Sequence, residues 1–312
     1  MEKNFWQKLE KPIIGLAPMD GVTDEPMRQI QCSIAKPDVI FTEFISAEGF
    51  CKRPERFTKK LAFKDNEKPI IVQVFGYTPE AFYQVVGELC HLGFSGIDLN
   101  MGCPAKSVLQ RGGGAALIGN YRLVENIIND CLKGIKDSGQ RIPLSIKTRI
   151  SGNRSETKDW FSFLSKFPLA EVTVHGRKLK QENSGPVNWE EIGIAARILK
   201  AKNILCLGNG GLKSLSEARE KCQRYNLDGI LIGQAALGNP WVFREDFQPT
   251  KNEVLTTILK HAELAWDFYG QKGYSTVLKH FGWYPRGFKG YKELKRKLLS
   301  TKNFEQTASV IG

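Results

Sequence analysis

Short apolar runs of strand length recur along the first three quarters of the chain, separated by segments with a helical period. These runs are rich in Ile, Val and Leu and alternate little between polar and apolar residues, which is typical of strands buried on both faces. The predicted strands lie at 13–17, 39–44, 69–75, 96–100, 144–148, 171–175, 204–208 and 229–232. Amphipathic helices are predicted between them, for example at 79–92, 124–137, 189–200 and 215–225.

Strands that alternate with helices in this number predict a (β/α)₈ TIM barrel. A doubly wound open sheet is the alternative, although such sheets normally have fewer strands. The pattern changes after Gly238-Asn239-Pro240-Trp241: helical runs follow at 253–269, 275–281 and 291–299, and no strand is predicted. We therefore expect a barrel domain at 1–240 and a small all-helical domain at 241–312.

Composition narrows the class of protein. The 312 residues are 41% hydrophobic and 25% charged, which is ordinary for a globular chain. The net charge of +12 favours a polyanionic partner such as nucleic acid over an anionic membrane surface. The seven cysteines and four histidines have no paired metal-binding spacing, and no apolar run is long enough to span a membrane. We expect a cytoplasmic protein with reduced thiols, no structural zinc or other metal, and no membrane segment.

Polar side chains recur at the carboxyl ends of the predicted strands, where barrel enzymes place their active sites. They are Asp20, Glu43, Gln73, Asn100, Lys147, Arg149, His175, Arg177, Asn209 and Gln234. Because burying polar groups without partners is costly, we expect a ligand to supply those partners.

Four of these strand ends predict the kind of ligand. Glycines at 208–211 and at Gly233 follow the last two strands, where bare backbone N–H groups often bind a phosphate; two ordinary tight turns are the alternative. Lys147 places an ammonium group in the barrel mouth, which suits an anionic cofactor ring, unless it simply extends to solvent. His175 is a hydrogen-bond donor to the same ring or a core histidine.

Cys103 has a setting unlike that of the other cysteines. It follows the strand at 96–100 on the turn Gly102-Cys103-Pro104. A thiol on such a turn is placed for chemistry, whereas an isolated cysteine is more often a small buried hydrophobe. The glycines at 112–114 lack G-x-G-x-x-G spacing, so a nicotinamide cofactor would have to bind transiently in the barrel mouth.

Several motifs together identify a family. They are Ala17-Pro18-Met19-Asp20-Gly21-Val22-Thr23-Asp24, Gln73-Val74-Phe75-Gly76, Asp98-Leu99-Asn100-Met101-Gly102-Cys103-Pro104, Lys147-Thr148-Arg149, Val174-His175-Gly176-Arg177, Ser184-Gly185-Pro186 with Trp189, Gly208-Asn209-Gly210, Ala236-Leu237-Gly238-Asn239-Pro240-Trp241 and Lys279-His280-Phe281-Gly282-Trp283-Tyr284. With these motifs in this order, the chain resembles the tRNA-dihydrouridine synthases, which are flavin oxidoreductases of the (β/α)₈ class with a C-terminal helical domain.

The resemblance implies bound FMN, NADPH as the transient reductant, and a tRNA uridine that is reduced to 5,6-dihydrouridine. It implies that FMN is held by Pro18, Met19, Gln73, Lys147, His175, Asn209, Gly210, Gly233 and Gln234. Cys103 takes the place of the catalytic acid, and Asn100, Arg177 and, more weakly, Arg149 would lie near the uracil.

Two positions depart from the family pattern. Gly211 stands where the family usually has Asp, and Gln234 stands where it usually has Arg. The second change removes a positive charge near the presumed phosphate, so FMN affinity would depend more on backbone N–H groups.

The chemistry needs a hydride at uracil C6 and a proton at C5. A neutral thiol is a suitable acid, because an unperturbed cysteine has a pKa near ~8.5 and is mostly protonated at pH 7. The base must be extruded from folded RNA, so the protein must also bind the surrounding tRNA.

Residues 284–297 interleave basic and aromatic side chains, and 51–60 form a second basic stretch. We expect Arg286, Lys295, Arg296 and Lys297 to contact the tRNA, unless they only form a solvated helix face.

Two other functions stay open at this point. One is an FMN-dependent oxidoreductase of a free pyrimidine, similar to dihydroorotate dehydrogenases, which shares the barrel but does not explain the basic extension. The other is a non-catalytic RNA-binding relative without flavin, which Gly211 and Gln234 alone favour. We expect a monomer.

Overall fold

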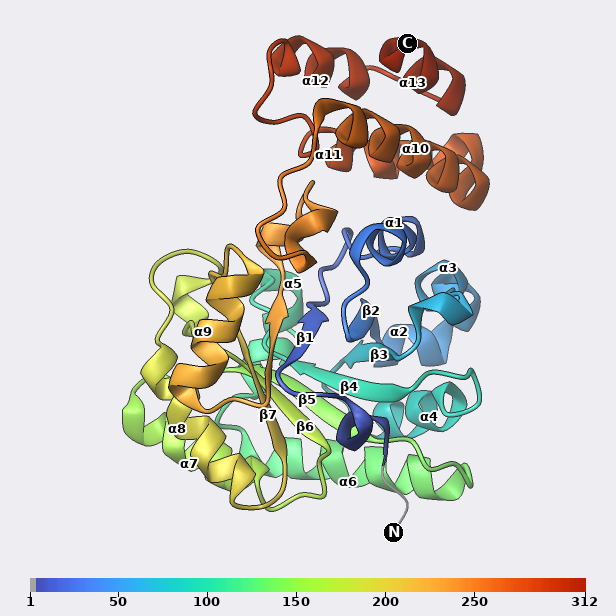
Figure 1. The fold of residues 1–312 in the computed structure, drawn as a ribbon. Coiled ribbons are helices and arrows are strands. Elements are labelled where there is room, and N and C mark those ends of the chain that lie inside the picture. The colour runs from blue at the N-terminus through green and yellow to red at the C-terminus, as the bar shows by residue number, and fades with distance from the viewer. Residues whose placement is uncertain (1–3) are drawn as a thin grey trace.

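A closed barrel of parallel strands forms the first part of the chain (Figure 1). The computed structural model describes residues 4–312. The strands pair in sequence order, and β1 pairs with β8 to close the barrel. They are β1 (Ile13–Leu16), β2 (Val39–Ser46), β3 (Ile70–Phe75), β4 (Gly96–Met101), β5 (Leu144–Arg149), β6 (Glu171–His175), β7 (Leu205–Asn209) and β8 (Gly229–Ile232). The predicted (β/α)₈ barrel is confirmed, and the open sheet is excluded.

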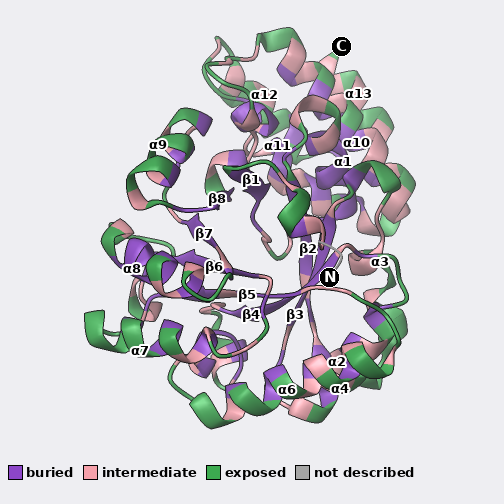
Figure 2. Ribbon diagram, turned by 60° about the horizontal axis from the view of Figure 1, so that its bottom comes forward, coloured by how far each residue is buried: buried purple, intermediate pink, exposed green. Residues whose placement is uncertain are grey.

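Helices surround the barrel and connect its strands (Figures 1 and 2). They are α1 (Glu25–Ala35), α2 (Ala47–Lys52), α3 (Thr58–Leu61), α4 (Pro79–Leu89), α5 (Lys106–Leu109), α6 (Tyr121–Asp137), α7 (Arg154–Leu164), α8 (Trp189–Lys200) and α9 (Leu215–Tyr225). The predicted bounds of α8 and α9 are confirmed. The basic stretch at 51–60 runs from the end of α2 into α3.

Residues along each strand alternate between the helix layer and the barrel interior. On β5, Ile146 packs in the apolar layer beneath the helices, while its neighbours Ser145 and Lys147 bond to residues of β4 and β7. The interior is apolar on the β1, β2, β7 and β8 side, where Phe41 and Leu231 pack in one cluster with Trp6. The polar interior residues therefore gather on the side formed by β3 to β6.

Four helices follow the barrel and lie together beyond it (Figure 1). They are α10 (Lys251–Gly273), α11 (Leu278–Phe281), α12 (Tyr291–Leu299) and α13 (Phe304–Ile311). A capping box starts α10: Thr250 Oγ1 accepts the N–H of Glu253, whose carboxylate accepts the N–H of Thr250. Gly270 breaks the helix with a φ of 65°. None of the helices described is long and apolar enough to cross a membrane.

The C-terminal helices have an apolar cluster of their own. It includes Trp241, Val254, Ile258, Ala262, Tyr274, Phe281 and Leu298. The predicted helix at 275–281 is instead a 3₁₀ turn, Tyr274–Val277, followed by α11. The sequence pattern does not predict the short helix α13, because its eight residues give too few turns for a clear period.

Helix α1 joins the C-terminal helices to the barrel. Its Gln31 side chain donates to the carbonyl of Pro240 at 2.7 Å. At its first turn, Asp24 accepts a hydrogen bond from the Tyr269 hydroxyl of α10 at 3.0 Å. Both bonds involve buried or partly buried groups, so this interface has a specific geometry.

Candidate active site

A cavity of about 530 Å³ opens at the carboxyl ends of the barrel strands. This volume is typical of a site for a cofactor or other small molecule. The predicted site residues that line it are Pro18, Met19, Asn100, Cys103, Lys147, Arg149, His175, Arg177, Asn209, Gly210, Gly233 and Gln234. The structure thus brings the predicted acid, the cations and the glycine turns to one place.

Five predicted site residues lie outside the cavity wall. Gln73 is fully buried on β3, and its amide is engaged by Asp98 and Asn100 at 2.7 and 2.9 Å. Arg286 lies just before α12, and Lys295, Arg296 and Lys297 lie on it, all four exposed. The predicted contacts of these residues with FMN and tRNA stay predictions.

Further residues line the cavity that the sequence did not predict as site residues. They include Phe44, Glu182, Asn183 and Leu212. Glu182 has a φ of 49°, an unusual backbone conformation for a residue with a side chain, which often marks a functional loop. No local sequence signal distinguishes Glu182 or Asn183 from ordinary loop residues.

The turn that carries Cys103 is held from both sides. The Asn100 side-chain oxygen accepts the N–H groups of Gly102 and Cys103 at 3.1 and 2.9 Å. The carbonyl of Cys103 accepts the N–H of Ala115 at 3.0 Å. Gly114 lies so close that a Cβ there would be 2.7 Å from that carbonyl, and its φ of 59° also favours glycine. The position of the thiol is therefore fixed by its backbone.

The protonation state of Cys103 suits an acid. Burial raises the pKa of its thiol, and nearby Asp20 raises it further, while Arg149 and Lys147 oppose the shift. The thiol is partly exposed to the cavity. It is therefore neutral at pH 7 and can donate a proton to a bound molecule.

Arg149 forms hydrogen bonds to two loops around the cavity. Its Nε donates to the carbonyl of Gly102 at 2.6 Å, and its two Nη groups donate to the Glu182 carbonyl and the Asn183 side chain. The loop after β4 is thereby tied to the loop after β6. The guanidinium also keeps a positive charge at the cavity wall.

Lys147 supplies a partly buried ammonium group. Its Nζ donates to the Asn209 side chain at 3.1 Å, and Asn209 donates in turn to the carbonyl of Leu231 at 2.8 Å. Burial, helped by the Arg149 charge, lowers the pKa of Lys147 to about 8, whereas Asp98 and Glu171 oppose the shift. The lysine is therefore mostly charged at pH 7 and poised to bind an anionic group.

A buried polar layer lies on the β3 to β6 side of the interior. The Asp98 carboxylate accepts from Gln73 at 2.7 Å and from Ser145 at 2.8 Å, and burial raises its pKa to about 6. Glu171 accepts from Thr173 at 2.7 Å, and burial raises its pKa well above the ordinary value. This layer orients Asn100 through Gln73, since the Asn100 amide donates to the Gln73 oxygen.

His175, at the end of β6, and Arg177, in the loop that follows, form a pair at the cavity. Arg177 Nη1 lies 3.3 Å from His175 Nε2. Because a guanidinium only donates, Nε2 is the acceptor and the ring proton sits on Nδ1. Burial, followed by the charge of Lys147, lowers the pKa of His175 to about 2, so the ring is neutral at any physiological pH. This leaves the Nδ1–H as a donor, and the predicted bond from His175 to a cofactor stays a prediction.

The glycine turns after β7 and β8 form the remaining wall. Gly210 and Gly211 have φ values of 123° and 68°, which favour glycine. The backbone N–H groups of Gly210, Gly211 and Gly233 donate to no acceptor within residues 4–312. Unpaired N–H groups on one wall and the Lys147 ammonium on another fit an elongated anionic cofactor with a phosphate. A flavin mononucleotide has this chemistry, so the residues present fit it.

The comparison with protein families shows which family this chain belongs to. The family model described as Dihydrouridine synthase (Dus) matches residues 15–310, which include the barrel and nearly all of the C-terminal helices. The chain belongs to the dihydrouridine synthase family. It is therefore an enzyme of an oxidoreductase family.

Curated bacterial members of the family resemble this chain over its full length. A "Probable tRNA-dihydrouridine synthase" of Staphylococcus aureus strain COL is 31% identical over 320 residues, covering 100% of this chain and 95% of the relative. A "Probable tRNA-dihydrouridine synthase 2" of Bacillus subtilis strain 168 is 29% identical, covering 100% and 96%.

More distant solved structures share the barrel fold. A dihydroorotate dehydrogenase from Eimeria tenella, solved with ferulenol, gives a TM-score of 0.54 at 11% identity and covers 83% of this chain and 84% of its own. A histamine dehydrogenase from Rhizobium sp. 4-9 gives 0.52 at 12% identity and covers 80% and 48%. At this identity the likeness extends to the fold alone.

Proposed function

We propose that this protein reduces a uridine of tRNA to 5,6-dihydrouridine, with FMN as its bound cofactor and NADPH as the reductant. One observation carries the proposal: a neutral thiol, a partly buried ammonium group and unpaired glycine N–H groups line one cavity at the end of the barrel. Membership of the dihydrouridine synthase family and the names of its bacterial relatives support the substrate.

Two sets of groups in the cavity would hold FMN. The phosphate would bind the N–H groups of Gly210, Gly211 and Gly233, and the anionic edge of the ring would face Lys147. Pro18, Met19, His175, Asn209 and Gln234 would complete the wall. Gln73 would act indirectly, because its side-chain oxygen holds the Asn100 amide in place. When bound, FMN would supply the hydride chemistry needed at C6 of the uracil.

Cys103 would deliver the proton to C5 of the same ring. Its thiol is neutral because burial raises its pKa, and its backbone is fixed by Asn100. The cations Arg149 and Arg177 would stabilise negative charge that develops on the uracil during reduction. Asn100 would serve chiefly by positioning the turn, since both ends of its amide are already engaged.

We further propose that the chain has two domains with separate roles, a catalytic barrel at 1–240 and a tRNA-binding helical domain at 241–312. The barrel and the C-terminal helices have separate apolar clusters, which supports two domains, and the clusters meet at 241–243, where Trp241 packs with the C-terminal helices and Val242 with the barrel. Arg286 and the exposed cations of α12 would grip the tRNA while the target base is extruded into the cavity. The enzyme would act in the cytoplasm, as a monomer.

The decisive experiment maps dihydrouridine in tRNA from cells with and without this protein, at single-nucleotide resolution. We expect at least one uridine position to lose the modification in its absence and to regain it when the gene is restored. In vitro, the purified protein should consume NADPH with that tRNA, but not with uracil or orotate. Equal activity on a free pyrimidine would favour the small-molecule oxidoreductase, and a protein that never binds FMN would favour the non-catalytic relative.

A further inference from the structure

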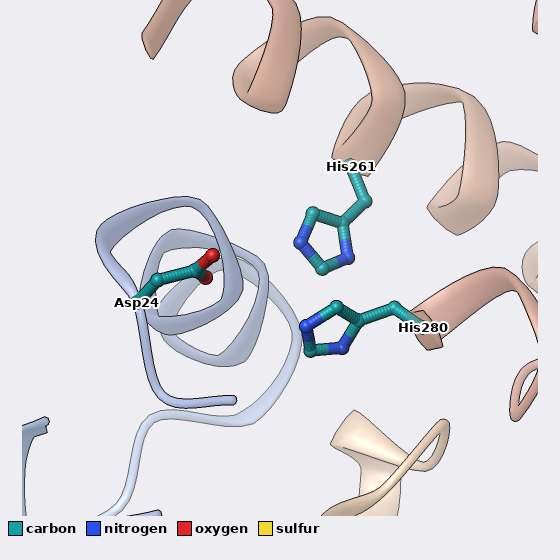
Figure 3. A group of neighbouring side chains, drawn as sticks. All are labelled: Asp24, His261 and His280. Carbon is teal, nitrogen blue, oxygen red and sulfur yellow. The ribbon is translucent and has the colours of Figure 1, made fainter. Parts of the chain in front are cut away.

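Three side chains from distant parts of the sequence meet where the barrel joins the C-terminal helices. Asp24 lies at the start of α1, His261 on α10 and His280 on α11 (Figure 3). Their exposed fractions are 5%, 0% and 1%. One potential ligand atom from each lies within 4.8 Å of the other two. None of the three lines the cavity at the carboxyl ends of the strands.

The two imidazoles present nitrogens that have no partner. Nε2 of His261 and Nε2 of His280 are buried and make no hydrogen bond within the part of the chain that the structure describes. Both rings turn a nitrogen toward the Asp24 carboxylate (Figure 3). Because buried polar groups are nearly always paired, two such nitrogens aimed at one point indicate that a further atom bridges them.

The surroundings hold the His261 ring in a fixed orientation. Its Nδ1 lies 2.8 Å from the Tyr284 hydroxyl. When Nδ1–H donates to that oxygen, the lone pair of Nε2 faces Asp24. Metal-binding histidines commonly have this arrangement, in which the second ring nitrogen is fixed by a hydrogen bond.

Asp24 keeps capacity for another contact. One of its oxygens accepts the N–H of Met27 at 3.0 Å, and the other accepts from Tyr269 at 3.0 Å. Each carboxylate oxygen can accept a second bond. Burial raises the pKa of Asp24 to about 6, and the charge of Lys279 limits this rise, so the group is mostly ionised at pH 7. Burial also lowers the pKa of His261 to about 3, so this ring is neutral.

We propose that Asp24, His261 and His280 bind a divalent transition-metal ion of the zinc type, which fastens the C-terminal helices to the barrel. Two imidazole nitrogens and one carboxylate oxygen are a donor set that suits zinc, whereas magnesium and calcium prefer oxygen ligands alone. The absence of paired Cys and His spacing led us to expect no structural zinc. Spacing detects only ligands that are close in sequence, and these three are not.

The metal would couple two parts of the proposed mechanism. Asp24 directly follows the segment 17–23, whose first residues line the cavity, and the two histidines lie on α10 and α11, in the same helical domain as the cations of α12 proposed to bind tRNA. Binding the ion would stabilise the folded state, because a site made from both parts exists only when they are docked.

The first test measures metal directly on the full-length protein, purified without a metal-affinity tag. We expect elemental analysis to find about one zinc per chain. After chelator treatment, added Zn²⁺ should restore the melting temperature and Mg²⁺ should not. Added Co²⁺ should give visible d–d absorption bands that respond to Zn²⁺ competition. Protein that carries no zinc, shows no Co²⁺ bands and gains no thermal stability from Zn²⁺ would overturn the proposal and leave water as the bridging group.

The second test uses matched variants. His261→Gln, His280→Gln and Asp24→Asn should each reduce bound zinc to background, and Asp24→Asn keeps an oxygen for the helix cap. His91→Gln, which changes an exposed histidine on the barrel, should bind as much zinc as the unchanged protein. Zinc retained by all three cluster variants would overturn the assignment. Because the Co²⁺ titration uses the unchanged protein, it tests the site even if a variant folds poorly, and it does not depend on the proposed activity.

Discussion

The side-chain oxygen of Asn100 accepts the backbone N–H of Cys103 at 2.9 Å. The residue that is expected to touch the uracil thus also holds the turn that carries the expected acid. Its amide nitrogen donates to Gln73, which donates to the buried carboxylate of Asp98. The thiol is therefore positioned by a chain of hydrogen bonds that begins inside the barrel.

Removing the thiol should abolish proton delivery and leave the cofactor site intact. We expect Cys103→Ala to bind FMN normally and to be reduced by NADPH at the usual rate. Its turnover of tRNA uridine should fall by about 10²- to 10⁴-fold, the usual contribution of a general acid. Rapid-mixing kinetics of the reduced enzyme with tRNA measure this step separately. Cys51→Ala, which removes an exposed thiol on α2, is the matched control, and unimpaired turnover in Cys103→Ala would exclude the acid role.

The affinity for FMN should depend on the charge of Lys147. Its pKa is lowered to about 8, so the ammonium group is present below pH 8 and is lost as the pH rises through that value. FMN binding, measured by flavin fluorescence, should therefore weaken between pH 7 and pH 9.5. Lys147→Met should bind about 10- to 150-fold more weakly at pH 7 and lose most of this pH dependence, since a charged hydrogen bond contributes about 1.5–3 kcal/mol.

Lys106 provides the control for that experiment. It also lines the cavity but is exposed to solvent. Lys106→Met should keep the pH dependence of the unchanged protein. If Lys147→Met retains the same pH profile, another group holds the anionic part of the cofactor.

A cation at position 234 should strengthen phosphate binding. Gln234 lies on the cavity wall next to Gly233, whose N–H donates to no acceptor within residues 4–312. We expect Gln234→Arg to raise the affinity for FMN by about tenfold, the effect of one charge-assisted hydrogen bond. Calorimetry with FMN and with riboflavin separates the two ends of the cofactor. The gain should be absent for riboflavin, and Gln234→Met should show no gain with either ligand.

The cations of α12 should strengthen tRNA binding through counterion release. Replacing Lys295, Arg296 and Lys297 by Ala should reduce the slope of log affinity against log salt by about 0.7–0.9 for each phosphate that these side chains neutralise. The ion pair of Lys297 with Glu293 at 3.1 Å is exposed, so removing it should cost little stability. Binding titrations at several salt concentrations measure the slope.

The control variant carries the same number of substitutions elsewhere. Lys133, Lys136 and Arg141 are exposed on and just after α6, at the other end of the barrel in Figure 1. Their replacement by Ala changes the net charge equally and should leave most of the slope intact. Equal reductions of the slope in the two variants would mean that overall charge, rather than the surface of α12, attracts tRNA.

The sequence by itself determined the barrel and the position of its site. Apolar strands buried on both faces have a strong local signal, and parallel strands must present their carboxyl ends on one side. Residues as distant as Met19, Cys103 and Gln234 can therefore be assigned to one cavity from the order of the strands alone. The order of the motifs added the family, which the comparison confirmed.

Only the tertiary structure decided how these residues use their polar atoms. It showed that Gln73 and Arg149 are engaged with the protein itself, and it added Glu182 and Asn183 to the cavity wall. It also brought His261 and His280 against Asp24. The physical reason is the same in each case: hydrogen bonds and ligand sets depend on distances of a few ångströms between packed elements, and local sequence patterns carry no information about those distances.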